Sequence, residues 1–422
     1  MTAAQPYQCS DYASVSPARV EGCKRILVIS FSPIAQDARV LKQVRLLSQS
    51  YQVTTCGFGP APEGIERHIQ IHHRCLPGKT WDALLQLRAY LAGYWLMPDV
   101  RSAWKQLRGL DCDAVLADDI DTLPVALRLK PRGGVHSDLH EFFPCLHEEH
   151  APWKKRIGPW YAWMVKRYVP QAVSVTTVSQ GIAHAYATMS GRSVGVVTNA
   201  TPYQDLTPSA VGTPIRVVHS GTSHRERNLD ALIDGVLAVS GFTLDLFLTP
   251  NDPAYLAQLK QRAQGEPRLS VHDAVPYDRL IATLNQFDLG VHLLPPKNFN
   301  FAHALPNKIF DFVQARLGVI VGPSPEMARL VRDTGCAVVT SGYQGDDLAA
   351  ALRGISVEEV ERMKQASHTH ARELSADSQL PIWGEVIATI LRKADGVPRT
   401  DRDTGALAEP DERLRRVGDD HE

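Results

Sequence analysis

The segment 304–326 combines groups that bind anions with a pattern that places them at the start of a helix. Pro306 suits the first helical turn, because it lacks an amide hydrogen that this turn would leave unpaired. The free amides of the turn, the helix dipole and the ammonium group of Lys308 would face an anion, and we expect a diphosphate beside Asn307. Asp311 follows on nearly the same helix face, where a carboxylate can accept ribose hydroxyls. An ordinary amphipathic helix with its apolar side chains in the core is the competing interpretation.

A second candidate for anion binding follows the predicted strand 215–219. The next loop carries Gly221 and Arg227 and opens a helix. A planar guanidinium at this point can hold phosphate oxygens beside the helix N-terminus. A solvated helix start is the competing interpretation for Arg227.

Composition places the chain among ordinary globular proteins. Its 422 residues are 44% hydrophobic and 22% charged, with a formal net charge of -1, so no global field attracts nucleic acid. The seven cysteines are scattered and form no C-x-x-C pair, which predicts reduced thiols in a cytosol rather than a disulfide framework or a zinc site. The first 25 residues lack the apolar region of a signal peptide, and no run approaches the roughly 20 apolar residues needed to span a bilayer. We expect a cytoplasmic protein, dissolved or peripheral at the inner face of the membrane.

Short β-branched runs alternate with helical patterns and predict an α/β fold of two doubly wound halves. Ligands of such sheets bind beyond the carboxyl ends of the strands. The predicted strands are 26–31, 52–57, 114–117, 134–137 and 173–178 in the first half, and 215–219, 244–248, 289–293, 319–321 and 337–340 in the second. The predicted divisions are a flexible segment 1–23, a Rossmann-like domain 24–197, a linker 198–213, a second Rossmann-like domain 214–380, a crossover helix 381–394 and a disordered tail 395–422.

The ordered set of motifs along residues 24–392 resembles the retaining glycosyltransferases of the large group that includes sucrose and mannosyl transferases. Its Pro-Asn-Lys form indicates one subgroup of that family. The segments that carry the resemblance are the Gly221 loop with Arg227-Asn228-Leu229, Asp288-Leu-Gly-Val, Leu305-Pro306-Asn307-Lys308, Phe310-Asp311-Phe312, Ser137-Asp138-Leu139-His140-Glu141-Phe142-Phe143-Pro144, Thr176-Thr177-Val178-Ser179 and Val197-Thr198-Asn199-Ala200.

The resemblance implies a GT-B architecture, in which two Rossmann-like doubly wound domains face each other across a cleft. It implies a nucleotide-sugar donor held mainly by the C-terminal domain, with Arg227 and Lys308 on the diphosphate and Gly221 and Asn307 beside them. Asp311 corresponds to the second of two acidic residues spaced eight apart. Fixed cations stabilise the charge that a nucleoside diphosphate gains as it leaves, so neither a metal nor another cofactor is required.

The same mapping places His140 where a histidine approaches the donor sugar. Asp138 and Glu141 flank it and are further catalytic candidates. A structural pair of His140 with Glu141 is the competing interpretation.

Two departures from the family pattern concern the same cleft. His303 occupies the first acidic position, so either the segment 300–303 holds the sugar differently or activity is lost. The glycine-rich loop after the first strand is absent, and Asp37 and Arg39 are candidates for the acceptor side instead. Asp119, in an acidic cluster that ends a strand, is a third acceptor-side candidate, although Asp also caps helices at such positions.

Two stretches combine aromatic and basic residues. The segment 152–170 has five basic residues and no acidic one, and the segment 81–96 is amphipathic and flanked by Lys79 and Arg88. Such patterns suit an anionic lipid interface, and the alternative is a pair of helices packed on the N-terminal sheet with solvated basic faces. Where the first interpretation holds, the acceptor is a lipid-linked saccharide.

The expected function is transfer of a hexosyl group from a nucleoside-diphosphate sugar to an acceptor hydroxyl with retention, in polysaccharide or glycoconjugate synthesis. The expected partners are the donor, a saccharide or lipid-linked acceptor and an anionic membrane surface, and not nucleic acid. One alternative is a nucleotide-sugar 2-epimerase, which needs no acceptor. Another is a non-catalytic binding subunit, which His303 favours and Arg227, Lys308 and Asp311 argue against.

Overall fold

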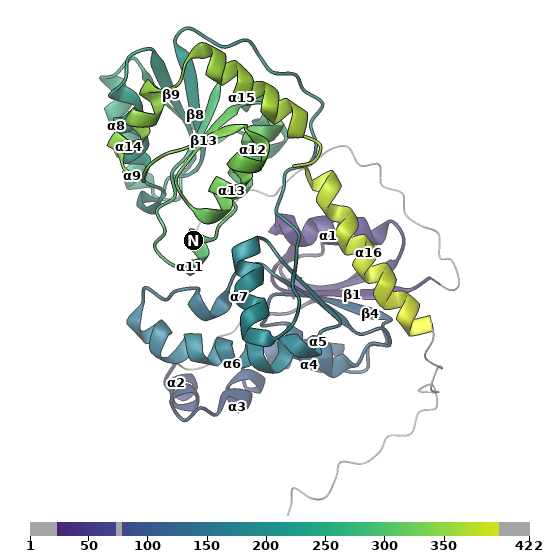
Figure 1. Ribbon diagram of the computed structural model, residues 1–422. Coiled ribbons are helices and arrows are strands. Elements are labelled where there is room, and N and C mark those ends of the chain that lie inside the picture. The colour runs from purple at the N-terminus through teal and green to yellow at the C-terminus, as the bar shows by residue number, and fades with distance from the viewer. Residues whose placement is uncertain (1–22, 73–77, 396–422) are drawn as a thin grey trace, which may run out of the picture.

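The computed structural model describes residues 23–72 and 78–395. These residues form two α/β domains, each built on one parallel sheet, and Figure 1 shows the C-terminal domain above the N-terminal one. The fold class expected from the sequence is therefore confirmed. Apart from Cys23 and Asp395, the predicted N-terminal segment 1–23 and the predicted tail 395–422 lie outside the described residues.

The N-terminal sheet has seven strands in the order β3-β2-β1-β4-β5-β6-β7. Its central strands β4 and β5 are buried at every position, as expected for a parallel sheet covered on both faces. Each strand predicted in this half is present, while the short edge strands β3 and β7 were not predicted. The strands are β1 (Arg25–Pro33), β2 (Gln52–Phe58), β3 (Arg67–Gln70), β4 (Ala114–Asp118), β5 (Val135–Leu139), β6 (Ser174–Thr177) and β7 (Gly195–Val196).

Helices cover both faces of this sheet and carry the apolar stripes that the sequence pattern indicated. In α1, for example, Val40, Val44 and Leu47 are buried against the sheet. The helices are α1 (Ala38–Ser48), α2 (Gly78–Gln86), α3 (Tyr90–Trp95), α4 (Pro98–Leu107), α5 (Leu123–Leu129), α6 (Gly158–Tyr168) and α7 (Gln180–Ser190), with shorter turns at η1 (Ile34–Gln36), η2 (Phe143–Cys145), η3 (Trp153–Ile157) and η4 (Val169–Gln171).

The C-terminal sheet has six strands in the order β10-β9-β8-β11-β12-β13. The strands are β8 (Ile215–Thr222), β9 (Phe242–Thr249), β10 (Leu269–Asp273), β11 (Leu289–His292), β12 (Gly318–Val321) and β13 (Ala337–Val339). The helices are η5 (Arg225–Arg227), α8 (Leu229–Leu237), α9 (Pro253–Gln264), α10 (Tyr277–Leu284), α11 (Phe299–Ala302), α12 (Asn307–Gln314), α13 (Pro325–Thr334), α14 (Gly345–Arg353) and α15 (Val357–His370). Of these six strands, β10 alone was not predicted from the sequence.

The last described helix, α16 (Ala376–Asp395), returns from the C-terminal domain to the N-terminal sheet (Figure 1). It begins five residues before the predicted crossover helix and includes Pro381. Ile387 and Ile390 are buried with Ile26 and Val28 of β1. The chain therefore crosses twice between the domains, once through the linker and once before α16. None of the helices within the described residues is long and apolar enough to span a bilayer.

Candidate functional site

The start of α12 presents a cation that no carboxylate neutralises directly. Pro306 is the N-cap residue, Asn307 is exposed and the apolar side chains of the helix, such as Phe310, are buried in the domain core. The buried apolar side chains agree with the interpretation as an amphipathic helix, and binding of a diphosphate at its start stays a prediction. The Lys308 ammonium group makes no hydrogen bond or ion pair with any residue that the structure describes. Burial, followed by the nearby Arg227, lowers the pKa of Lys308 to about 8, although Asp311 opposes the shift.

Gly221 and Arg227 lie beside this ammonium group. A Cβ built on Gly221 would stand 2.5 Å from Cε and 2.9 Å from Nζ of Lys308, so a side chain at this position would push the end of the lysine aside. The Arg227 Nε donates to Thr222 Oγ1 at 3.3 Å, and its guanidinium carbon lies 5.9 Å from the ring centre of Phe301. The structure thus brings together the predicted cationic pair and the predicted glycine. Two adjacent cations without a paired carboxylate form a site that an anion would complete.

Two histidines next to this pair were missed by the sequence analysis. His219 and His292 lie on the neighbouring strands β8 and β11, with stacked rings whose centres are 5.9 Å apart. Burial, followed by Lys308, lowers the pKa of His219 to about 3 and holds that of His292 well below its usual value. Both rings are therefore neutral. The Nδ1 of His219 donates to the Val291 carbonyl at 2.8 Å, which leaves its buried Nε2 without a hydrogen-bond partner among the described residues. Their positions toward the carboxyl ends of parallel strands were the available signal.

Asp311 is bonded to the linker between the domains. Its Oδ1 accepts a hydrogen bond from Thr201 Oγ1 at 2.5 Å, and the residue is only 5% exposed. Lys42 of α1 reaches the same stretch of linker and donates to the carbonyl of Ala200 at 2.6 Å. Burial raises the pKa of Asp311 to about 6, against the influence of Thr201, Lys308 and Lys42. The predicted contact of Asp311 with a ribose stays a prediction.

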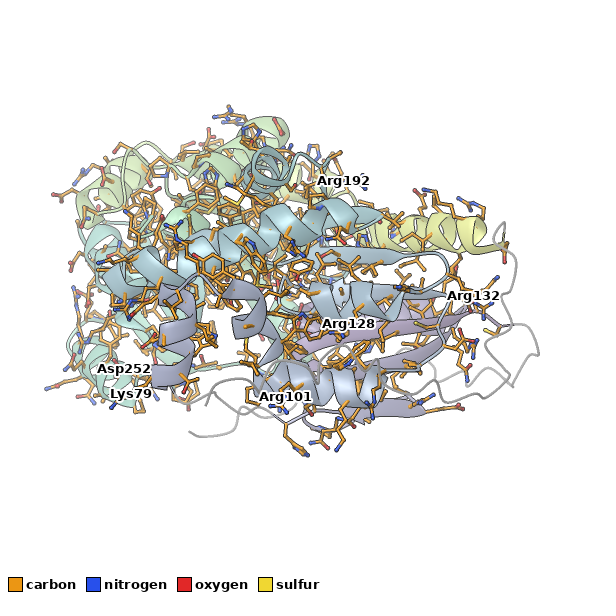
Figure 2. The ribbon with its side chains drawn as sticks, turned by 90° about the horizontal axis from the view of Figure 1, so that it is seen from below. Lys79, Arg101, Arg128, Arg132, Arg192 and Asp252 are labelled. Atoms are coloured by element: carbon orange, nitrogen blue, oxygen red, sulfur yellow. The ribbon has the colours of Figure 1, made fainter. Side chains whose placement is uncertain are left out.

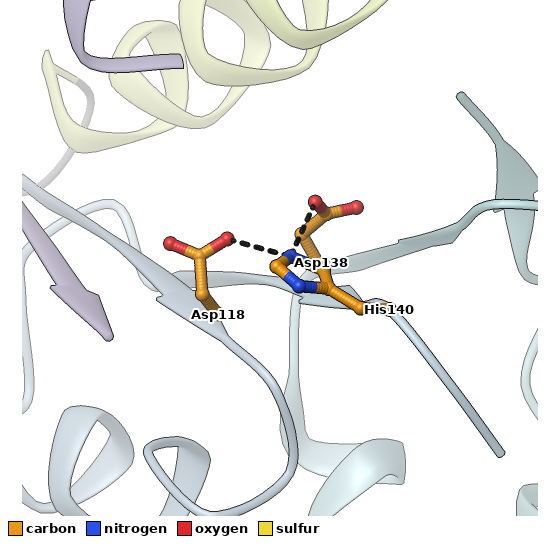
Figure 3. Close-up of side chains that lie close together, drawn as sticks. All are labelled: Asp118, Asp138 and His140. Carbon is orange, nitrogen blue, oxygen red and sulfur yellow. Dashed lines mark ion pairs between the residues drawn. The ribbon is translucent and has the colours of Figure 1, made fainter. Parts of the chain in front are cut away.

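On the N-terminal side, His140 lies among three carboxylates at the ends of β4 and β5, and Figure 3 shows two of them, Asp118 and Asp138. Its Nε2 is 3.4 Å from Asp118 Oδ1 and 3.5 Å from Asp138 Oδ2, and its Nδ1 is 3.5 Å from Asp119 Oδ2. Burial opposes a charge on this ring, but the carboxylates prevail and raise the pKa of His140 well above its usual value. Since the side chain is 20% exposed, it presents an imidazolium to the surface of the domain.

Asp118 was not singled out within its acidic cluster, although it is fully buried beside His140, as Asp138 is. Its side chain is fully buried, and neither carboxylate oxygen has a hydrogen-bond partner within the described part of the chain. Burial raises the pKa of Asp118 to about 7, while His140 opposes that shift. Asp118 therefore takes up a proton closer to neutral pH than an ordinary aspartate does.

The carboxylate of Asp138 is occupied by hydrogen bonds from neighbouring side chains and is not open to a substrate. Arg39 donates to both of its carboxylate oxygens, at 2.7 and 2.8 Å, and Gln43 and Thr176 donate at 2.7 and 2.6 Å. Burial works against the charge, but Arg39 and His140 lower the pKa of Asp138 well below its usual range. Arg39 is only 3% exposed and stacks on Trp383 of α16, at 4.7 Å from the ring centre. In this arrangement Arg39 holds Asp138, and its acceptor-side role stays a prediction.

The remaining predicted residues of the N-terminal side have varied surroundings. Asp37 caps α1, since its side chain accepts from the amides of Arg39 and Val40. Asp119 has a left-handed backbone with φ 63° and accepts the amide hydrogen of His140 at 2.8 Å. Glu141 is exposed. The structure therefore gathers Asp118, Asp119 and His140 at the ends of β4 and β5, whereas Asp37 caps a helix.

Asp118, Asp138 and His140 are also the group within the described residues whose ligand atoms lie close enough together to hold a metal ion. The donor set fits a cation poorly. The carboxylate of Asp138 already accepts four hydrogen bonds, two of them from the permanently charged Arg39. An imidazolium at His140, 3.4 Å from Asp118 and 3.5 Å from Asp138, balances part of the charge of these carboxylates without a metal.

The two domains touch at the predicted sugar-binding segment of the C-terminal domain. His303 lies against Gly181 at the start of α7, where a Cβ on the glycine would stand 2.0 Å from its Nδ1. Ser179 donates to the His303 carbonyl at 2.8 Å. Nearby, the backbone of Phe142 donates to Asn300 Oδ1 at 2.7 Å and accepts from its Nδ2 at 3.2 Å. The residue that replaces the expected carboxylate is therefore part of the contact between the domains.

Comparison with known proteins adds the fold family. No family model and no curated protein sequence matches the chain. Among solved structures it is similar to sucrose-phosphate synthase from Thermosynechococcus elongatus, with a TM-score of 0.63, 12% identity and coverage of 87% of this chain and 99% of that one. It is similar to HepE of Anabaena in complex with UDP, with a TM-score of 0.63, 14% identity and coverage of 87% and 100%. It is also similar to α,α-trehalose 6-phosphate synthase from Burkholderia multivorans, with a TM-score of 0.57, 14% identity and coverage of 89% of this chain and 99% of that one.

These likenesses establish the fold, which is GT-B. Two parallel sheets of seven and six strands form two Rossmann-like domains, and the matched structures are covered over nearly their whole length.

Proposed function

We propose that the chain is a glycosyltransferase that takes a hexosyl group from a nucleoside-diphosphate sugar. The observation that carries this proposal is the unpaired Lys308 ammonium group beside Gly221 and Arg227 at the start of α12. A pyrophosphate between these cations would receive charge-assisted hydrogen bonds from both side chains and from the free amides of the first helical turn. HepE of Anabaena, which shares the fold, has been solved with UDP and with UDP-glucose.

The cations would act mainly on the leaving group. As the bond between the anomeric carbon and the diphosphate oxygen breaks, the electron pair moves onto the diphosphate. The acceptor oxygen forms the new bond to the anomeric carbon, and its proton leaves with the diphosphate product. Lys308 and Arg227 lower the barrier because the charge that they face increases in the transition state. Retention at the anomeric carbon is part of the proposal and requires departure and attack on the same face.

His140 would position the sugar rather than the phosphate. As an imidazolium it has only N–H groups to offer. Its Nε2 is buried beside Asp118 and Asp138, so the Nδ1–H, which lies 3.5 Å from Asp119 Oδ2, is the group that would also reach a hydroxyl oxygen of a hexose. Asp118 and Asp119 hold its charge and its orientation. The proposed roles are therefore Lys308 and Arg227 for the diphosphate and His140 for the sugar.

A non-catalytic binding subunit is a second candidate, and His303 is the observation that favours it. The ring is engaged with Gly181 and lies 3.8 Å from Glu326 Oε1, so it does not replace the missing carboxylate. A 2-epimerase is a third candidate and would use the same donor site. The intact cationic pair favours nucleotide binding in all three cases.

For the remaining features of the function, we propose that the acceptor is a saccharide or a lipid-linked saccharide and that the product belongs to a polysaccharide or glycoconjugate. We further propose that the protein works in the cytoplasm, at or near the inner face of the membrane. Catalysis without a metal or other cofactor is also proposed, since Lys308 and Arg227 supply positive charge where the diphosphate would lie.

The experiment that tests the proposal is a thermal-shift panel of nucleoside diphosphates and their sugars, followed by product analysis with the ligand that stabilises most. A ligand present at 100 times its dissociation constant adds about 2.7 kcal/mol to the free energy of unfolding. A stabilising nucleotide sugar that gives a glycosylated product only with an added acceptor supports the transferase. Isomerised donor without acceptor supports the epimerase, and binding without turnover supports the binding subunit.

A further inference from the structure

A hollow of about 780 Å³ opens between the end of α3 and the helices α4 and α5, and none of its lining residues belongs to the candidate site. Four basic side chains and two tryptophans contribute to its lining, and no acidic residue does. These six residues are Trp95, Arg101, Trp104, Lys105, Arg108 and Arg128.

Arg128 is held in place inside this hollow by the two tryptophans. Its guanidinium carbon lies 4.4 Å from the ring centre of Trp95 and 4.5 Å from that of Trp104. Within the described residues, neither Arg128 nor the three other cations of the hollow form an ion pair or a hydrogen bond. A planar cation fixed by aromatic rings and free of a carboxylate is prepared to receive an anion.

Exposed apolar side chains lie on the segment of chain that leads into the same hollow. Among the described residues, four large hydrophobic side chains are markedly exposed, and three of them belong to the α2–α3 hairpin: Leu87 at 79%, Leu91 at 46% and Leu96 at 42%. Leu96 also lines the hollow. Single exposed leucines are ordinary on a protein surface, whereas three within ten residues beside four unpaired cations are not.

The packing of the hairpin does not account for these leucines. Its inner face is anchored by Leu85 and Tyr94, which are buried, and by the ring contact of Trp81 with Trp160 at 5.4 Å. Figure 2 looks at the molecule from the side of α2 to α4, with Lys79, Arg101 and Arg128 labelled. The outer face of the hairpin therefore carries apolar groups that the domain itself leaves uncovered.

The second basic and aromatic stretch, at 152–170, has a different structure. Its aromatic and apolar side chains Trp160, Tyr161, Met164, Val165 and Tyr168 are buried in the core of the N-terminal domain. Lys154, Lys155, Lys166 and Arg167 remain exposed. For this stretch the structure supports the interpretation as packed helices with a solvated basic face.

We propose that Leu87, Leu91 and Leu96, together with Arg101, Lys105, Arg108 and Arg128, form a docking surface for an anionic phospholipid bilayer. The three leucines would enter the apolar boundary of the bilayer, the hollow would take one anionic headgroup against Arg128, and the other cations would contact neighbouring headgroups. Charge complementarity identifies the occupant, because the surface joins four unpaired cations to exposed aliphatic groups. A nucleic acid would match the cations but not the leucines.

Flotation with liposomes tests this surface in the full-length protein. The vesicles are phosphatidylcholine alone and phosphatidylcholine mixed with phosphatidylglycerol. The test variants are the triple substitution Arg101→Gln/Lys105→Gln/Arg108→Gln and the double substitution Leu87→Ser/Leu91→Ser. The matched control is Arg279→Gln/Arg332→Gln/Arg353→Gln, which removes three exposed arginines from the C-terminal domain.

The wild type and the control are expected to float only with the anionic vesicles. Both test variants are expected to lose at least nine tenths of the floated fraction while keeping the thermal unfolding midpoint and the nucleotide affinity of the wild type. Equal flotation of wild type and triple variant, or a wild type that does not float with anionic vesicles, would overturn the proposal. Nucleotide affinity reports on the donor site separately, so a failure of this surface is distinguishable from a failure of the proposed function.

Discussion

The ammonium group of Lys308 lies against the backbone of Gly221, so close that a Cβ on the glycine would stand 2.9 Å from Nζ. The two residues come from the start of α12 and the end of β8, which the parallel order of the sheet brings to the same edge. Gly221 is thus needed for the space that it leaves. The contact joins the two motifs on which the proposed diphosphate site rests.

Replacing Gly221 by alanine is therefore expected to displace Lys308 from the proposed phosphate position. We predict that Gly221→Ala lowers the affinity for the stabilising nucleoside diphosphate about tenfold or more, which corresponds to about 1.4 kcal/mol. Calorimetric titration measures the change. Gly265→Ala is the control, since no atom of the described chain lies within 4 Å of a Cβ built there. An affinity equal to that of the control would show that Lys308 and Gly221 do not cooperate in binding.

The pKa of Lys308, lowered to about 8 by burial and then by Arg227, predicts a pH dependence of binding. The ammonium form is present below that pH and is lost as the pH rises through it, so nucleotide affinity is expected to fall on the alkaline side. Titrations over a series of pH values check this expectation. Lys308→Arg is the control, because a guanidinium stays charged over the range and its profile should lack the fall. Parallel profiles for lysine and arginine would contradict the assignment.

Asp138 and Arg39 make the buried ion pair behind His140, with nitrogen and oxygen 2.7 Å apart. Removing the carboxylate in Asp138→Asn leaves a buried guanidinium without its counter-charge, and we expect a loss of about 3–5 kcal/mol in the free energy of unfolding. Denaturant titration measures it. Asp273→Asn breaks the exposed pair with Lys260 and should leave stability unchanged. Equal effects of the two substitutions on the free energy of unfolding would mean that the ion pair of Asp138 with Arg39 does not stabilise the N-terminal domain.

Because the pKa of Asp138 is lowered in the folded protein, acid is expected to reduce the free energy of unfolding. Burial opposes the carboxylate charge, but Arg39 and His140 hold the pKa below its unfolded value. Its contribution to stability is thus fully present above the unfolded value of about 3.9 and is lost as the pH falls below it. The wild type should lose more stability on acidification than Asp138→Asn does, as followed by denaturant titrations at several pH values. Identical acid sensitivity would contradict the pairing.

Gly181 and His303 supply a test of the contact between the domains. A methyl group at Gly181 would fall 2.0 Å from Nδ1 of His303, so Gly181→Ala forces the histidine or α7 to move. Overpacking of this kind costs about 1–3 kcal/mol and should lower the thermal unfolding midpoint. Gly384→Ala in α16 meets open space and should keep or raise the midpoint. A Gly181→Ala variant as stable as wild type would mean that the domains separate readily at this point.

The sequence pattern predicted much of this molecule where the signal was local. Alternating apolar runs located the central strands, and the Pro-Asn-Lys motif located the start of α12. The short edge strands β3 and β7 were missed, since only four and two residues carry the pattern. His219 and His292 were missed because their neutrality and stacking depend on the order of β8 and β11 in the sheet.

Arg39 shows why the acceptor side was harder to predict than the donor side. Its place in the first loop suggested a cleft residue, but the fold brings it to Asp138, to the carbonyl of Val197 and to Trp383 of α16. None of these partners is close to it in the sequence. Polar residues after a strand identify the edge at which a site forms, whereas the direction of each side chain depends on contacts that only the folded chain supplies.

Calorimetric titration of the stabilising nucleoside diphosphate into wild type and Lys308→Ala tests the central claim most directly. Thermal unfolding of both proteins without ligand verifies that the variant is folded. Arg227→Ala removes the other cation of the pair and is measured for comparison. The account predicts that Lys308→Ala and Arg227→Ala bind too weakly to measure while the wild type binds. A folded Lys308→Ala variant with the affinity of wild type would contradict it.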